Sequence, residues 1–243
     1  MVVFLTSSPT GPLDRSRVVE GFDVKNQFRE NLKKYWDRPA RCLMIAASPE
    51  DIDSNHEMQA FFAHALEISG LPVEVMDIWD CRTTDFSKGT LHSYDVILLG
   101  GGHVPTQNAF FHSIGLAKKM RDFEGLVIGI SAGTMNSAQI VYAQPELPGE
   151  ALDPGYRKFL KGLGLTTTNI LPHYQMVKDW MLDGMRLYED ITYGDSHGHE
   201  FVVLVDGSYL LIENGIETIW GEAYLITEGL CHKICGEDEI CRL

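Results

Sequence analysis

The pentapeptide GISAG at residues 129–133 has the residue types and spacing typical of a catalytic nucleophile. It follows an apolar run at 126–130, which we predict to be a buried strand, and precedes a helical pattern at 134–142. In such an elbow, a sharp strand-to-helix turn holds the serine in a strained conformation with its hydroxyl exposed, and the next amide, that of Ala132, donates to an oxyanion. The motif therefore predicts Ser131 as a nucleophile. A plain strand–turn–helix junction is the alternative.

Three consecutive glycines at residues 100–102 end another predicted strand at 95–99. In a parallel sheet this strand would lie beside the Ser131 strand, and its glycine turn would supply a second backbone donor to the oxyanion. A glycine-rich turn before a helix also binds phosphate, but neither the G-x-G-x-x-G nor the Walker pattern is present. We therefore expect the oxyanion role, with a simple turn as the alternative.

A serine needs a neighbouring base to become a good nucleophile, and the chain offers nine histidines. His173 follows a short apolar run, so it would stand at the carboxyl end of a strand, where open α/β sheets bind ligands. The alternative is a histidine in a surface loop. The residues alone leave the orienting acid open, because turn chemistry fully explains Asp206 in its Asp-Gly dipeptide. Asp195 and Glu213 are the rival acids.

Apolar runs alternate with amphipathic helical patterns over the first 130 residues. The runs cover residues 2–7, 41–47, 73–78, 95–99 and 126–130. The helical patterns cover 54–66, after a capping box of Ser54 and Glu57, and 110–120, up to Gly125. This alternation predicts an α/β fold with a mostly parallel sheet and helices on both faces.

The last third of the chain has a different pattern. Strands are predicted at 201–205, 208–212 and 216–220, and the dipeptides Asp206-Gly207 and Asn214-Gly215 between them are hairpin signals. We expect these strands to add an antiparallel part to the sheet, within a single domain spanning residues 1–243.

Composition restricts the possible partners. The chain has 20 basic and 34 acidic residues, a net charge of −14, and no run of Lys or Arg, which excludes a typical nucleic-acid-binding protein. No apolar stretch approaches the roughly 18 residues of a membrane helix, and no signal peptide is recognisable. We expect a cytoplasmic protein without membrane or nucleic-acid partners. Exposed edge strands would be compatible with a homodimer.

The cysteines do not form a recognisable metal motif. Of the five, Cys231, Cys235 and Cys241 lie near the end of the chain, with a spacing that matches no common zinc pattern. We expect buried or idle thiols there, and a polar loop rather than a metal site around His197 and His199. The sequence thus predicts no metal and no cofactor.

Four motifs, taken in chain order, resemble the peptidase E (aspartyl dipeptidase) family and its cyanophycinase relatives. They are GGGH at 100–103, GISAG at 129–133, LPHY at 171–174 and VDGS at 205–208. The resemblance covers roughly residues 40–225 and implies the class I glutamine amidotransferase-like, flavodoxin-like fold of that family.

The resemblance also implies site residues. It implies a triad of Ser131, His173 and Asp206, with oxyanion donors at Gly101 or Gly102 and at Ala132. The family typically has Glu at the position of Asp206, and either carboxylate holds the imidazole in the required tautomer.

Three positions depart from the family pattern. His103 stands where the family often has Asn. Arg186 matches the central residue of a Thr-Arg-Glu segment that recognises an N-terminal aspartate in the family, but the residues on either side of Arg186 do not match that segment. We expect His103 and Arg186 to contact substrate, and Arg186 would suit an acidic side chain. Ser131 occupies the position of the amidotransferase cysteine, which argues against ammonia transfer.

The sequence thus favours a serine peptidase acting on small peptides, with an N-terminal acidic residue as one candidate preference. Two alternatives stay open. An esterase of the α/β-hydrolase fold expects its acid before its histidine, and only His232 follows Asp206. The other is a non-catalytic binding protein with the same fold.

Overall fold

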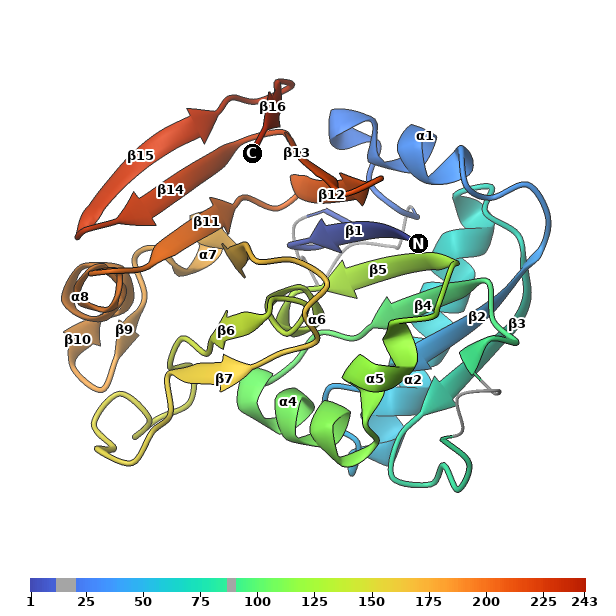
Figure 1. Ribbon diagram of the computed structural model, residues 1–243, viewed down its shortest axis with the longest axis horizontal. Helices are drawn as coiled ribbons and strands as arrows, with labels where there is room; N and C mark the ends of the chain where they lie inside the picture. The colour runs from blue at the N-terminus through green and yellow to red at the C-terminus, as the bar shows by residue number, and fades with distance from the viewer. Residues whose placement is uncertain (12–20, 87–90) are drawn as a thin grey trace.

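The computed structural model describes residues 1–11, 21–86 and 91–243, and its main feature is an eight-stranded sheet (Figure 1). From edge to edge the strands are β16 (Ile240–Arg242), β13 (Ile216–Trp220), β12 (Tyr209–Glu213), β1 (Val2–Thr6), β5 (Leu126–Ile130), β4 (Val96–Leu99), β2 (Ala40–Ile45) and β3 (Val73–Trp79). Strands β1, β5, β4, β2 and β3 are parallel. The others are antiparallel. The predicted mostly parallel sheet is therefore confirmed.

Helices cover both faces of this sheet, as predicted. Because side chains alternate between the faces of a strand, Phe4 packs with α1 (Phe28–Lys33) and α2 (Ile52–Ile68) on one face. Its neighbour Leu5 belongs to the core on the other face, with α4 (Val104–Ser113) and α5 (Leu116–Met120). The central strands are thus buried on both sides, which explains their continuous apolar sequences.

Two helix predictions need correction. Helix α2, predicted from a capping box at Ser54, starts earlier, because Asp51 is its N-cap and the Asp51 carboxylate accepts from the Ser54 amide over 3.2 Å. The pattern at 110–120 forms two helices instead of one. Gly115 adopts φ 62° between them, a left-handed conformation that ends α4 and precedes α5.

A second sheet of four strands lies beside the first. It contains β15 (Leu230–Cys235), β14 (Ala223–Thr227), β11 (Glu200–Leu204) and β8 (Asn169–Leu171), in that order. Since β11 and β12 belong to different sheets, Asp206-Gly207 carries the chain from one sheet to the other, and its prediction as a hairpin turn was wrong. Asn214-Gly215 does form a hairpin, with φ 52° and 75°, between β12 and β13.

The chain after the GISAG motif also differs from the prediction of a helix to residue 142. Only one turn, α6 (Ala132–Met135), is helical, and the chain then forms β6 (Ile140–Tyr142), which pairs with β7 (Phe159–Lys161). The helix ends where buried Asn136 turns its amide to the Val104 carbonyl and to Gln107. The β-branched residues that follow favour a strand.

Short elements complete the described chain. They are a 3₁₀ turn (Lys25–Gln27), α7 (Tyr174–Val177), β9 (Met181–Leu182), β10 (Met185–Arg186), a π-helical segment (Leu187–Thr192) and α8 (Tyr193–Asp195). Over the described residues, none of the helices combines the length and the apolar character that crossing a bilayer requires.

Candidate active site

Ser131 lies in the sharp turn between β5 and α6. Its backbone has φ 51° and ψ −110°, outside the regions that residues with a side chain prefer. The Ser131 amide donates to the Thr6 carbonyl over 3.1 Å, which ties the turn to the end of β1. The residue stays partly accessible to solvent. The fold thus presents the serine at the carboxyl end of a central parallel strand.

Crowding explains the glycines on either side of the serine. A Cβ atom on Gly129 would lie 2.9 Å from Leu5 Cδ2, and one on Gly133 would collide with the Leu99 carbonyl oxygen. Both glycines therefore allow α6 to pack directly against the sheet, with the serine strained at the point of the turn.

His173 approaches Ser131 from the second sheet. It follows β8 in a left-handed conformation, φ 61° and ψ 29°, and its Nε2 lies 2.9 Å from Ser131 Oγ. Buried Ser7, just after β1, accepts the His173 amide over 2.7 Å and donates to the Leu204 carbonyl over 3.2 Å. A hydroxyl that sequence analysis did not single out therefore holds the histidine loop between the two sheets.

Asp206 lies behind the histidine. Its Oδ1 is 2.7 Å from His173 Nδ1, and its side chain is completely buried. The Asp206 amide donates to Gln175 Oε1 over 3.0 Å. The second carboxylate oxygen, Oδ2, is buried without a hydrogen-bond partner among the described residues. Because a buried carboxylate is costly unless it is paired, the histidine contact accounts for this residue better than turn chemistry does.

The two rival acids lie elsewhere. Asp195 accepts from the Tyr142 hydroxyl over 2.8 Å and from Lys158 Nζ over 2.7 Å, and Glu213 accepts from the Tyr35 hydroxyl over 2.8 Å. Neither carboxylate is the one that contacts His173.

The glycine turn at 100–102 lies next to Ser131, because β4 pairs with β5. A Cβ atom on Gly101 would be 3.4 Å from Ser131 Cβ, and one on Gly102 would be 2.7 Å from Ala47 Cβ. Gln107 Nε2 donates to the Gly100 carbonyl over 2.6 Å and holds the turn. Bare backbone therefore approaches the serine from this side, while Ala132 is fully buried at the start of α6.

His103 interacts with two glutamates, Glu146 and Glu150, and Glu146 also interacts with the charge of His173. Its Nε2 lies 2.8 Å from Glu150 Oε1 and its Nδ1 lies 2.8 Å from Thr106 Oγ1. The other Glu150 oxygen accepts from the amides of Glu146 and Leu147, both over 2.9 Å. Desolvation would raise the pKa of Glu150, but these amides and His103 together lower it.

Glu146 is the most unusual carboxylate of this group. It is accessible to solvent, yet desolvation raises its pKa and the negative charge of Glu150 adds to the rise, while His103 and His173 partly offset it. Its interaction with the charge of His173 places Glu146 within electrostatic range of the candidate active site. Sequence analysis missed Glu146, because a loop position carries no periodic or motif signal.

Arg186, predicted to bind substrate, is engaged elsewhere. Its Nη2 and Nε donate to the two carboxylate oxygens of Asp190 over 2.6 and 3.0 Å, four residues along the chain. The pair is exposed, and the Arg186 hydrogen bonds lower the pKa of Asp190 to about 2. Arg186 is therefore already neutralised in this structure.

Comparison with known proteins places this chain in a family. The model of peptidase family S51 matches residues 22–219. The chain belongs to peptidase family S51. Membership makes this S51 chain a hydrolase of the peptidase class. No curated protein matches it.

Two solved structures resemble the S51 chain in fold. One is a peptidase from an acI-B1 actinobacterium, with 14% identity, coverage of 100% of this chain and 96% of that one, and a TM-score of 0.65. The other is a putative peptidase E protein from Listeria monocytogenes EGD-e, with 15% identity, coverage of 96% and 98%, and a TM-score of 0.59. Both support the predicted peptidase E-type, flavodoxin-like fold.

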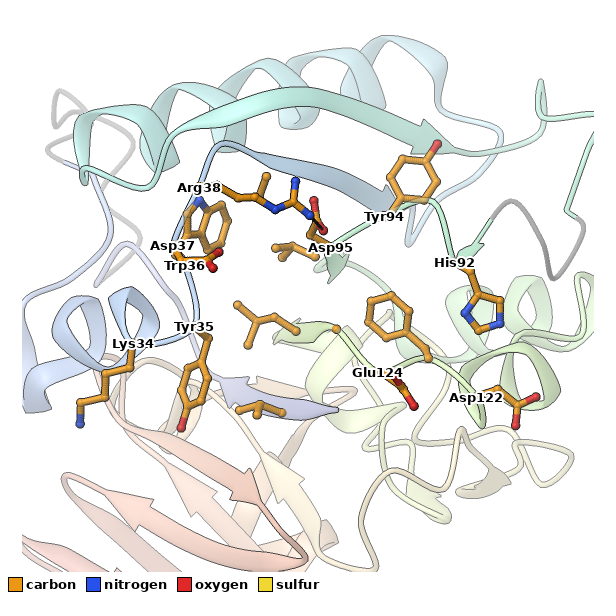
Figure 2. A pocket seen from close by; sticks show the side chains of 16 residues that line it. Lys34, Tyr35, Trp36, Asp37, Arg38, His92, Tyr94, Asp95, Asp122 and Glu124 are labelled. Carbon is orange, nitrogen blue, oxygen red and sulfur yellow. Dashed lines mark hydrogen bonds and ion pairs between the residues drawn. The ribbon is translucent and has the colours of Figure 1, made fainter.

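None of the candidate active-site residues lines a large cavity of the S51 chain, about 810 Å³ in volume, whose lining Figure 2 shows. It is lined by Val2, Ala40, Val96 and Leu126, at the amino ends of β1, β2, β4 and β5, whereas Ser131 follows the carboxyl end of β5. Polar groups in its wall pair with one another, as Arg38 does with Asp95 over 2.5 Å. The cavity therefore lies at the amino ends of the parallel strands, and the candidate active site lies at their carboxyl ends.

Proposed function

We propose that this peptidase is of the serine type and hydrolyses small peptides through Ser131, His173 and Asp206, by way of an acyl-enzyme. The observation that supports this best is the continuous line of short contacts from Ser131 Oγ to His173 Nε2 and from His173 Nδ1 to Asp206 Oδ1. A serine, an imidazole and a buried carboxylate in this order form the arrangement that activates a hydroxyl in unrelated serine hydrolases.

Proton transfer follows from the same geometry. Asp206 accepts a hydrogen bond from the Nδ1–H of His173, which leaves Nε2 unprotonated and able to take the proton of Ser131 as its oxygen attacks the scissile carbonyl. The imidazolium then protonates the leaving amine. A water molecule, deprotonated by His173, next attacks the acyl-enzyme, and its proton returns to Ser131 as the acid product leaves.

The oxyanion of each tetrahedral intermediate needs donors that are fixed before the reaction. We assign them to the Ala132 amide and to the amide of Gly101 or Gly102. The positive end of one helical turn and a glycine turn without side chains both suit this task. The close approach of Gly101 to Ser131 supports the assignment.

The charges around the site favour a substrate with a cationic end. Glu146 is accessible and close enough to His173 for their charges to interact, and a short peptide carries a free α-ammonium group within a few bonds of its first peptide bond. We propose that Glu146 faces this group. The predicted preference for an N-terminal acidic residue stays a prediction, and it would require Arg186 to leave Asp190.

The test is hydrolysis of a dipeptide panel by the wild type and by Ser131→Ala. The panel pairs Asp-X, Ala-X and Lys-X peptides with the same peptides blocked by N-acetylation. A fluorophosphonate probe reports separately whether Ser131 is activated, whatever the substrate. We expect cleavage of unblocked peptides and labelling of the wild type, with both lost in Ser131→Ala.

Each outcome has a distinct meaning. Labelling without cleavage of any peptide would keep the activated serine and point to an ester substrate. Equal inertness of the wild type and Ser131→Ala toward both probe and peptides would contradict catalysis by Ser131 and favour a binding protein. Preferential cleavage of Asp-X over Ala-X and Lys-X, lost in Arg186→Ala, would support the preference for an acidic side chain, in addition to recognition of the α-ammonium group.

A further inference from the structure

Two cysteines and a glutamate converge near the end of the chain, outside the candidate active site. Ligand atoms of Cys235, Glu239 and Cys241 all lie within 4.8 Å of one another, the only such group of potential metal ligands in the described parts of the chain. The cysteine spacing alone argued against a metal site, because it matches no zinc motif. The fold changes that argument, because it adds a carboxylate to the two sulfur atoms.

Local hydrogen bonds hold the three groups in place. Cys235 ends β15 in the second sheet and pairs with Ala223, while Cys241 lies in β16 of the main sheet and pairs with Ile219. In the turn between them, Glu239 accepts the Gly236 amide through Oε2 over 2.7 Å. The Glu239 carbonyl accepts the Gly221 amide over 2.9 Å. Supporting hydrogen bonds of this kind orient metal ligands.

The local charge also favours a cation. Glu237, Asp238 and Glu239 place three acidic residues in a row in this turn. Of the basic residues nearby, Lys233 is already paired with Glu222 over 2.9 Å, and Arg242 follows Cys241, so acidic side chains outnumber basic ones around the turn. The two thiols could also pair as a disulfide, but a disulfide would leave the carboxylate of Glu239 unused, whereas a divalent cation would bind all three groups.

We propose that Cys235, Glu239 and Cys241 bind one zinc ion, with the fourth tetrahedral position left to water. Thiolate and carboxylate ligands together suit Zn²⁺ better than Mg²⁺ or Ca²⁺, which prefer oxygen alone. Binding displaces the two thiol protons to solvent as two Zn–S bonds form. Tetrahedral bonds of about 2.3 Å put sulfur atoms about 3.8 Å apart, so shifts of about 1 Å would close the site.

Zinc at this position would join the two sheets. Cys235 and Cys241 belong to different sheets, and the turn that they bracket contributes Glu237 and Asp238 to the lining of a small cavity of about 90 Å³ that reaches Asp206. β15 and β16 lie together beside the chain's C-terminus (Figure 1). The ion would therefore fix the turn that lies behind the carboxylate of the proposed triad.

The experiment titrates the reduced full-length chain with Cd²⁺, which replaces Zn²⁺ at thiolate sites and gives an ultraviolet sulfur-to-metal charge-transfer band. We expect one Cd²⁺ per chain, displaced by Zn²⁺. Cys241→Ser should abolish the band. Glu239→Gln should weaken binding by at least the roughly 10- to 100-fold that loss of a merely supporting group costs.

The matched control is Cys81→Ser, because Cys81 is an exposed thiol outside the group. It should leave both the band and the stoichiometry unchanged. A second measurement follows stability: Zn²⁺ should raise the Tm of the wild type and of Cys81→Ser but not of Cys241→Ser, since a ligand stabilises only a protein that binds it. Cys241 is partly exposed, so this variant avoids a buried core position.

Three results would overturn the proposal. They are a reduced wild type without saturable Cd²⁺ binding, a band that persists in Cys241→Ser, and a Cys235–Cys241 disulfide whose reduction yields thiols that bind no metal. None of these results depends on whether the protein cleaves peptides, so the zinc site and the proposed peptidase activity stand or fall separately.

Discussion

At the scale of single residues, the buried carboxylate of Asp206 carries most of the functional argument. It lies in a protein with 34 acidic residues, yet its environment differs from that of a surface acid. Oδ1 contacts the imidazole, Oδ2 has no hydrogen-bond partner among the described residues, and the side chain is fully buried. A carboxylate held in this way stabilises a neighbouring imidazolium strongly, because water does not screen the pair.

Asp206→Asn tests this role directly. Asparagine keeps the shape of the side chain but loses the charge that stabilises the imidazolium and allows the wrong imidazole tautomer. We expect kcat to fall by about 10⁴ with little change in fold, measured on the best substrate of the panel and by circular dichroism. Glu213→Gln is the control, and it should leave kcat unchanged. Equal losses in both variants would remove Asp206 from the triad.

Glu146→Gln tests the proposal that Glu146 faces the α-ammonium group of the substrate, and it should also change how the stability of the protein depends on pH. Because the pKa of Glu146 is raised above its ordinary value of 4.5, the folded protein holds this proton more tightly than the unfolded chain does. Its contribution to stability is therefore fully present below pH 4.5 and is lost as pH rises through the folded pKa. The wild type should lose stability relative to Glu146→Gln over that interval, measured by urea denaturation at several pH values.

The same variant should raise KM for peptides with a free amino terminus and leave N-acetylated peptides unaffected. A uniform fall in kcat for both kinds of peptide would instead give Glu146 a role in positioning His173. Pairing the two measurements separates substrate binding from stability.

Single residues also show what could be predicted from sequence. Ser131 and His173 could be predicted because a motif or a strand end marks them, and the structure brings them together. Asp206 needed the family resemblance, since its Asp-Gly dipeptide has a sufficient local explanation. Ser7 and Glu146 carried no signal, because Ser7 hydrogen-bonds His173 and Glu146 interacts with the charges of His103 and His173, all far away along the chain, and sequence spacing does not report such interactions.

At the scale of elements, strands buried on both faces were predicted well, and junctions were predicted poorly. The runs at 126–130 and 95–99 became β5 and β4, because a continuous apolar run has few alternatives in a parallel sheet. The residues after Ser131 looked helical to position 142 but form one helical turn and a strand. There the pairing of β6 with β7 and the buried amide of Asn136 override the local pattern.

Gly133→Ala tests how tightly the elbow packs. The added methyl would collide with the Leu99 carbonyl, so α6 must move away from β4. We expect a loss of about 1–3 kcal/mol in the free energy of unfolding, typical of overpacking, together with loss of fluorophosphonate labelling.

Gly194→Ala is the matched control, because a Cβ atom there meets no atom within 4 Å and the residue lies in helix α8. Its stability should stay within about 0.5 kcal/mol of the wild type. If Gly133→Ala behaved like this control, the elbow would be looser than the structure indicates.

At the scale of the whole molecule, charge is the dominant property. A net charge of −14 on 243 residues produces self-repulsion in the compact state, while exposed ion pairs such as Arg41–Glu74 and Arg186–Asp190 contribute little each. Salt weakens both effects. Because the 34 acidic residues exceed the 20 basic ones, the stability gained when salt screens acidic repulsion should exceed the stability lost when salt weakens the ion pairs.

We therefore expect the Tm at neutral pH to rise between about 10 and 150 mM NaCl. Over this range the Debye length falls from about 30 to about 8 Å, so salt screens most of the repulsion between exposed acidic groups. Each kcal/mol gained corresponds to about 2–4 °C for a chain of this size. At pH 5, near the isoelectric point of 5.0, repulsion vanishes and only the ion pairs respond, so the Tm should stay constant or fall slightly. Calorimetry at both pH values measures the difference, and a Tm that falls with salt at neutral pH would mean that paired charges outweigh the net acidity of the chain.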